Sequence, residues 1–352
     1  MKKLTLLLFT FIFLLSSCVP RVTEITQPAP QTLTIMTHDS FSVSEEVVAA
    51  FETANNAKVT FLQSGDAGSV LNKAILTKEA PLADVLFGVD NTFLSRALEA
   101  DIFEPYASPA LADIPAAFHL DPSNRALPVD YGDVCINYDK KYFAENALAV
   151  PQSLEDLTQP EYAGLLVVQN PATSSTGLAF LLATVAHFGE DGYLDFWRAL
   201  KANVVVVVDG WETAYYTNFS ASSGRGPQPM VVSYGTSPAA EVIFADPPID
   251  DAPTASILGP DTCFRQIEFV GILKGTENHP LAEKFVDFML GKQFQEDVPL
   301  QMFVYPVNPN AVLPEAFVKY AQAPVQTAAL SPEKIAANRD RWIQEWTDAV
   351  MK

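Results

Sequence analysis

The chain has 352 residues, of which 49% are hydrophobic and 18% are charged, and this composition is typical of a folded protein long enough for two domains. Its formal net charge of −20 disfavours binding to nucleic acid or to anionic lipid headgroups, because like charges repel. The three cysteines and four histidines form no Cys-x-x-Cys or Cys/His cluster, so the sequence predicts no metal site.

Residues 1–17 have the features of a signal peptide. Lys2 and Lys3 precede the apolar run LTLLLFTFIFLL, which is shorter than the ~20 residues that span a bilayer. The following LSSC resembles a bacterial lipobox, in which Cys18 becomes the lipid-bearing first residue, and simple secretion is the alternative. Loss of both lysines with the signal would change the formal charge from −20 to −22. Residues 18–31 are polar and contain proline, which predicts a lipid-anchored tether.

Strand and helix patterns alternate from residue 32 to residue 100. The pattern predicts strands at 32–38, 58–63 and 83–90, and helices at 43–56, 68–79 and 92–100. This βαβαβ order predicts a parallel α/β sheet. Ligands of such sheets bind at the carboxyl ends of the strands, which here carry the segments 38–41, 64–68 and 90–91.

A second unit of the same style follows. The patterns predict a long strand-like run at 126–143, helices at 176–189 and 191–203, strands at 204–208 and 229–234, and a second long run at 264–275. We therefore expect two α/β lobes joined by extended hinge strands, with lobe 1 at 32–133, lobe 2 at 134–263, and 264–352 forming the return to lobe 1 and C-terminal helices. Cys135 and Cys263 lie in or beside the two runs, and they are interpreted either as a disulfide or as two buried thiols.

A set of short motifs along the chain resembles one known family. The motifs, in order, are LTIMTHDSF, GDAGSVLNKA, ADVLFGVDN, VDYGDVCINYDK, NPATSSTGLAFLL, GWETAY, VVSYGTSPA, YPVNPNAVLP and RDRWIQEWTDAV. Together they resemble the thiamine-binding extracytoplasmic proteins of bacterial ABC importers, from about residue 32 to the C-terminus. The resemblance implies a type II periplasmic-binding-protein clamshell, no catalysis and no cofactor. It also implies thiamine or its mono- or diphosphate as the transported ligand, an ABC permease as partner, and a monomer in the bacterial cell envelope.

Aromatic side chains near strand ends are the first candidate ligand contacts, since thiamine has flat rings that stack on aromatic faces. Trp211 and Tyr215 follow the valine run 204–208, and Tyr234 closes the strand at 229–234. The resemblance implies ligand contact for Trp211 and Tyr234, whereas the pattern alone favours buried packing rings. Tyr216 is expected to pack, and Phe303 matches a family position that often carries a larger ring.

Polar candidates surround the same strand ends. Asp66, with its neighbour Ala67, either faces the thiazolium cation or caps the helix beginning near residue 68. His38 stands where the family commonly has tyrosine, and beside a cation it should stay neutral. The hydroxyl run Thr173–Thr176 contains Ser174, which matches a family ligand contact, and Ser175. One of these hydroxyls is expected to cap the following helix, whose N-terminus would also suit a phosphate.

Two other functions are compatible with parts of the sequence. Adjacent tyrosines such as Tyr215 and Tyr216 serve as ligands in ferric-iron-binding proteins of the same fold. A secreted hydrolase is the second alternative, although the sequence has neither a G-x-S-x-G elbow nor an H-E-x-x-H pair.

Overall fold

The computed structural model describes residues 29–221 and 226–352. Cys18, the predicted signal peptide 1–17 and most of the predicted tether lie outside these ranges, so what we expect of them stays a prediction. Among the described helices, none has the length and apolar character needed to cross a bilayer.

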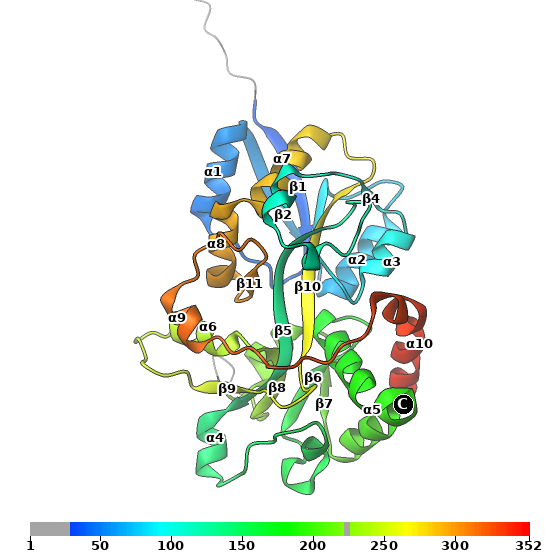
Figure 1. Cartoon of the computed structure of the whole chain (residues 1–352), viewed down its shortest axis with the longest axis vertical. Coiled ribbons are helices and arrows are strands. Elements are labelled where there is room, and N and C mark those ends of the chain that lie inside the picture. Colours follow the sequence, from blue (N-terminus) through cyan, green and yellow to red (C-terminus); the bar gives the residue numbers. More distant parts are fainter. Residues whose placement is uncertain (1–28, 222–225) are drawn as a thin grey trace, which may run out of the picture.

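One continuous sheet passes through two lobes that lie one above the other (Figure 1). Its main path has the order β2-β1-β3-β10-β5-β8-β6-β7, and β4, β9 and β11 pair at its sides. The strands on the path are β1 (Gln31–Thr37), β2 (Ala57–Gln63), β3 (Val85–Asp90), β5 (Leu127–Asp139), β6 (Leu166–Gln169), β7 (Val206–Val208), β8 (Met230–Tyr234) and β10 (Phe264–Leu273). The short strands are β4 (Phe103–Glu104), β9 (Thr254–Ile257) and β11 (Tyr305–Pro306).

Lobe 1 contains the predicted βαβαβ unit. Strand β1 pairs in parallel with both β2 and β3, whereas β3 pairs antiparallel with β10 on its other side. The sheet is therefore mixed and not purely parallel as predicted, but all six residues of β3 are buried, as expected for a central strand. Across the lobe core, the rings of Phe51 and Phe285 meet edge to face at 5.1 Å. The helices of this lobe are α1 (Glu45–Asn55), α2 (Ala67–Leu76), α3 (Leu94–Glu99), α7 (His279–Leu290) and α8 (Lys292–Gln301).

Lobe 2 is built on one long helix, α5 (Ser175–Ala202). The sequence predicted two helices here, and the structure breaks the helical geometry at Gly189, whose φ of 71° suits a glycine. The remaining helices of the lobe are α4 (Lys140–Glu145), α6 (Ser237–Ile243), α9 (Glu315–Tyr320) and α10 (Pro332–Val350).

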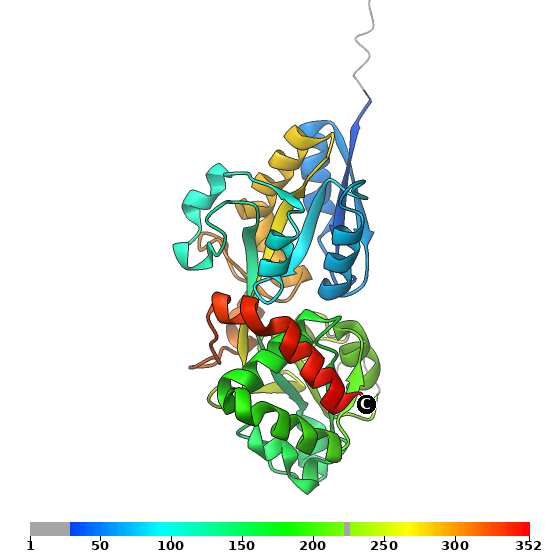
Figure 2. The same ribbon diagram turned by 90° about the vertical axis from the view of Figure 1, so that its right-hand side faces the viewer.

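The C-terminal helices divide the last part of the chain between the lobes. Helices α7 and α8 lie in lobe 1, whereas α9 packs on α6 (Figure 1) and α10 packs on α5 (Figure 2). The buried rings of Trp197 and Trp346 meet at 5.5 Å and fix α10 on α5. Segment 264–352 therefore does not join lobe 1 as a whole, because the apolar face of α10 is buried against lobe 2.

The extended run predicted at 126–143 is shorter in the structure. Strand β5 ends at Asp139, whose carboxylate accepts hydrogen bonds from the backbone N–H groups of Lys141 and Tyr142 at 3.0 and 3.1 Å. This cap begins α4, so the last four residues of the run are helical.

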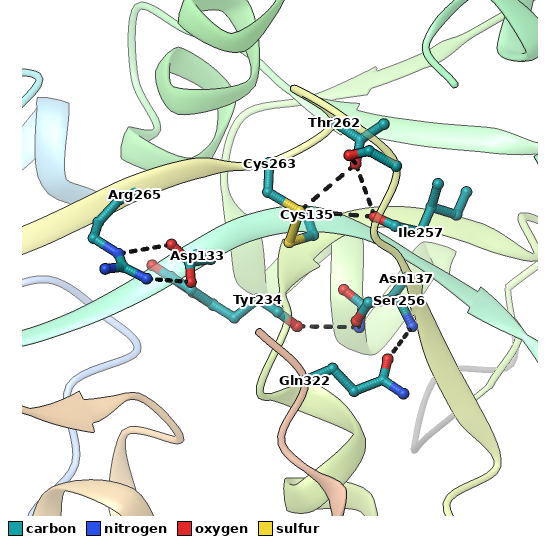
Figure 3. The surroundings of a disulfide bond; sticks show 11 residues. Asp133, Cys135, Asn137, Tyr234, Ser256, Ile257, Thr262, Cys263, Arg265 and Gln322 are labelled. Carbon is teal, nitrogen blue, oxygen red and sulfur yellow. Dashed lines mark hydrogen bonds and ion pairs between the residues drawn. A yellow bond between two sulfur atoms is a disulfide. The ribbon is translucent and has the colours of Figure 1, made fainter. Parts of the chain in front are cut away.

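Strands β5 and β10 are the hinge pair that both lobes share. They pair antiparallel, and a disulfide joins Cys135 of β5 to Cys263, which immediately precedes β10 (Figure 3). Beside it, the guanidinium of Arg265 donates two hydrogen bonds to the carboxylate of Asp133, at 2.9 and 2.8 Å. The hinge is thus held by covalent and ionic links in addition to its backbone ladder.

We expect the Cys135→Ala/Cys263→Ala double variant to be less stable by about 2–4 kcal/mol, because the bond closes a loop between residues 128 apart in sequence. Guanidinium chloride unfolding measures the difference. Reductant should lower the stability of the parent protein and leave the double variant unchanged, and equal stability of the two oxidised proteins would contradict the expectation.

Candidate functional site

A cavity of about 1060 Å³ lies between the lobes, which is large enough for a small organic molecule. Lobe 1 contributes residues 38–42 and Asp66, and lobe 2 contributes Ser175, Thr176 and parts of 211–253. Asp139 and Lys141 of lobe 2, Glu268 of hinge strand β10 and residues 301–304 complete the wall. Loops at strand ends and the hinge itself therefore surround one space.

Two aromatic rings form a fixed pair in the lobe 2 wall. Trp211 and Tyr215 stack with ring centroids 5.0 Å apart and an interplanar angle of 17°, and Tyr216 lies edge-on to both. Trp211 Nε1 donates to Ser233 Oγ at 2.9 Å, and the Tyr215 hydroxyl donates to Glu241. Because Tyr215 covers one face of the Trp211 indole, only the opposite indole face is available to stack on a ligand.

A single turn of π-helix, Thr213–Asn218, gives these rings their arrangement. It buries Tyr215, which is 3% exposed, and leaves Tyr216 43% exposed. Such turns are rare and are found frequently at functional sites. Hydrophobic periodicity does not predict them, so the sequence analysis did not anticipate this one.

Asp66 links the two lobes. Its Oδ1 accepts hydrogen bonds from the backbone N–H groups of Ala67 at 2.6 Å and Ser175 at 3.3 Å, and its Oδ2 accepts one from Trp211 at 3.0 Å. Burial raises the pKa of Asp66 to about 6, although the N–H of Trp211 and the hydroxyl of Ser174 oppose the rise. Asp66 therefore lines the cavity and also caps α2. The helix cap is one of the two roles that the sequence predicted for it.

The hydroxyl run before α5 does not cap that helix, contrary to our expectation. Ser174 occupies the N-cap position without a side-chain cap bond, and its Oγ lies 3.0 Å from Thr176 Oγ1 instead. The carboxylate of Asp66 accepts the Ser175 N–H in place of a local hydroxyl. The local sequence could not reveal this, because the capping group comes from the other lobe.

The remaining sequence-predicted residues divide into two groups. Tyr234 and Phe303 line the cavity, with Phe303 edge-on to Phe244 at 5.1 Å. Ala67 and Ser174 are buried just behind the wall and do not line it.

His38 lies at the base of the cavity and is 5% exposed. Its Nδ1 is 2.9 Å from Ser40 Oγ, and its Nε2 is 3.6 Å from Glu268 Oε1 and has no hydrogen-bond partner among the described residues. Burial lowers the pKa of His38 to about 4, so the imidazole is neutral at pH 7, as expected from the sequence.

Carboxyl groups on the hinge strands were missed by the sequence analysis. Glu268 of β10 lines the cavity and lies directly opposite Asp130 of β5 and Asp90 of β3 in the sheet register. Burial raises the pKa of Asp130 to about 7 and that of Glu268 well above its ordinary value. Glu268 is the lone acidic residue in the apolar run FRQIEFVGIL, and an acid in a predicted buried strand was the available signal.

The described cavity lining is strongly acidic. It contains seven acidic residues and one lysine, Lys141, whose ammonium lies 3.9 Å from Glu145. The acidic residues are Asp39, Asp66, Asp139, Glu212, Glu241, Asp246 and Glu268. Among the described residues, no group of three or more His, Cys, Asp or Glu side chains is arranged to hold a metal ion. The acidic lining and the stacked pair of Trp211 and Tyr215 together suit a ligand that carries positive charge and flat rings.

Comparisons with known proteins agree on one family. Residues 80–328 match the model of the bacterial extracellular solute-binding proteins. The chain is 30% identical to the thiamine-binding periplasmic protein of Escherichia coli, over 96% of this chain and 100% of that protein. It is also 30% identical to the corresponding protein of Brucella suis, over 92% and 93% of the two chains. The solved structure of a periplasmic thiamin binding protein has a TM-score of 0.81 at 29% identity and covers 96% of this chain and 100% of that one.

Two lobes on shared hinge strands, with one large cavity between them, define a clamshell solute-binding protein. The chain belongs to the family of bacterial extracellular solute-binding proteins, and it is similar to the thiamine-binding members of that class. The fold class and the family resemblance predicted from the sequence are thereby confirmed.

The Asp130→Asn variant tests the energetic cost of the buried carboxyl. The pKa of Asp130 is raised from 3.8 to about 7 in the folded protein, so between these values the folded state holds a proton that the unfolded state has lost. This group therefore lowers stability progressively as the pH rises through that range. We expect the melting temperature of the variant, relative to the parent, to increase from about pH 4 to about pH 8. Differential scanning calorimetry of both proteins at each pH measures this difference in melting temperature. A difference that does not change with pH would contradict the raised pKa of Asp130.

Proposed function

We propose that this protein captures thiamine, or one of its phosphate esters, outside the cytoplasmic membrane and delivers it to an ABC permease. The observation that carries the proposal is the combination of an acidic cavity with the fixed Trp211–Tyr215 pair. This combination is complementary to thiamine, which joins a flat aminopyrimidine to a cationic thiazolium. Similarity to thiamine-binding periplasmic proteins over nearly the whole chain supports the same ligand.

Within this proposal the candidate residues have distinct roles. Trp211 presents its uncovered indole face to one ring of the ligand, and Tyr215 supports the indole from behind. Tyr234 and Phe303 bound the cavity from lobe 2 and from the segment after α8. Asp66 contributes negative charge and keeps the loops of lobe 2 in register with α2 through its three backbone hydrogen bonds.

The ferric-iron alternative has weaker support. The Tyr215 hydroxyl is engaged by Glu241, and Tyr215 also carries the Trp211 stack. Iron coordination would require both contacts to be rearranged. A visible tyrosinate-to-iron absorption band after addition of ferric ion would instead support iron. Turnover of ester or phosphoester substrates would support the hydrolase alternative.

Isothermal titration with thiamine, thiamine monophosphate and thiamine diphosphate tests the proposed ligand. We expect saturable one-to-one binding of at least one of the three, with no product formed. Trp211→Ala should weaken binding by roughly tenfold or more, since the stack contributes about 0.5–1.5 kcal/mol beyond the area that it buries. Trp211→Phe retains a ring without the hydrogen bond to Ser233, and it should bind with intermediate affinity.

Absence of heat and of any thermal shift with all three compounds would refute the proposed ligand. A Trp211→Ala variant with unchanged affinity and a lower melting temperature would show that the indole is a packing ring only.

We further propose that Cys18 carries the lipid that anchors the mature protein to the membrane. Cys18→Ser should move the protein from the membrane fraction to the soluble fraction, because serine lacks the thiol that carries the lipid. Stable anchoring requires more than one acyl chain, and no other anchor is proposed. Fractionation of cells that express each form, with metabolic labelling by a fatty acid, measures the change. Membrane partitioning of the variant that equals that of the parent would contradict the lipobox interpretation.

A further inference from the structure

Three buried carboxyl groups, those of Glu268, Asp90 and Asp130, lie side by side on neighbouring strands at the hinge, and none of them is among the ligand contacts proposed above. Glu268 on β10 is directly opposite Asp90 on β3 in one register and Asp130 on β5 in the other. Directly opposite residues of antiparallel strands project from the same face of the sheet with their Cβ atoms about 4.5–5.5 Å apart. The three carboxyls therefore form one row at the base of the cavity, and Glu268 reaches the cavity surface.

Asp90 at one end of the row is well supplied with donors. Its Oδ1 accepts bonds from the backbone and hydroxyl of Thr92 and from the N–H of Phe93, and its Oδ2 accepts one from Gln266. Asp130 differs, since it is 1% exposed and no described N–H or hydroxyl group donates to either of its oxygens, which leaves the facing carboxyl of Glu268 as its hydrogen-bonding neighbour. A buried carboxylate without a donor is strongly unfavourable, so Asp130 requires a proton or a nearby cation.

The groups that face Glu268 supply no fixed positive charge. They are Asp130 on β5, Asp90 on β3, Asp66 at the start of α2, Tyr234 on β8 and the neutral His38 after β1. Arg265 is three residues away on β10, on the opposite face, where it binds Asp133. Like charges directly opposite in a sheet destabilise it, so Glu268 and Asp130 cannot both be ionised without a compensating cation.

We propose that Asp130 and Glu268 share one proton in the ligand-free protein, and that the cationic group of the ligand replaces this proton when it binds beside Glu268. The proton leaves to solvent, and the pair becomes a counter-anion for the bound cation. The raised pKa values of both groups, caused by burial, agree with this arrangement. The inference rests on the proposed function, because it requires a cationic ligand, and it assigns Glu268 as an additional binding residue.

A definite pH dependence follows. Each proton released on binding makes the association constant rise up to tenfold per pH unit while the free pair is still protonated, and the rise ends once the pair has lost its proton. Affinity for thiamine should therefore increase through the neutral range. The dependence should be weak for an uncharged thiophene analogue of thiamine, which brings no cation to displace the proton.

Calorimetric titration of thiamine at pH 7 in two buffers with different ionisation enthalpies counts the protons released. We expect clear proton release from the parent protein with thiamine and close to none with the uncharged analogue. Glu268→Gln should release almost none and should bind thiamine roughly ten- to a hundredfold more weakly, as expected for loss of a charged partner. Glu283→Gln, at a half-buried carboxyl on α7 that lies 3.5 Å from His279 and outside the cavity, is the control and should bind thiamine and release protons like the parent.

An infrared difference spectrum of the unmodified protein gives an independent readout that does not depend on how the variants fold. The carbonyl band of a protonated carboxyl should disappear when thiamine is added. Thiamine binding without proton release, or proton release that persists in Glu268→Gln, would overturn the shared-proton inference and leave the proposed function intact. Absence of any thiamine binding would overturn the proposed function itself.

Discussion

The pairing of β5 with β10 is the constraint on which the rest of this structure depends. Both lobes add their strands to the two sides of this pair, so the sheet is continuous and the cavity forms where the lobes separate. The Cys135–Cys263 bond and the Arg265–Asp133 ion pair reinforce one face of the hinge (Figure 3). The opposite face carries Glu268 and Asp130, and it forms the base of the cavity.

The same constraint explains why the cavity is electrostatically unusual. Strands that run from one lobe to the other are buried on both sides, and a carboxyl on such a strand is removed from water. Asp66 is buried for a related reason, because it lies where α2 of lobe 1 meets the N-terminus of α5. A cavity with several poorly solvated carboxyls attracts a cation more strongly than an exposed acidic surface does, since the effective dielectric constant is lower.

Aromatic geometry supplies the second component of recognition. The π-helical turn after β7 places Trp211 on Tyr215, and the hydrogen bond to Ser233 fixes the indole. A ring held in this way loses little conformational freedom when a ligand stacks on it, so less binding energy is spent on ordering the site. The aromatic pair belongs to lobe 2 and the carboxyl row to the hinge. A ligand that joins a flat ring to a cation can therefore span both.

The sequence by itself determined the alternating α/β elements, the two-lobed organisation and part of the cavity lining, including His38, Asp66, Trp211 and Tyr234. These follow from hydrophobic period, strand ends and ordered family motifs, which are local in the chain. Only the tertiary structure decided that α10 packs on lobe 2, that Asp66 and not a local hydroxyl binds the first N–H of α5, and that Glu268 faces Asp130. Each of these depends on contacts between residues more than a hundred positions apart. Such contacts are set by strand register and lobe packing, on which the local pattern of residues carries no information.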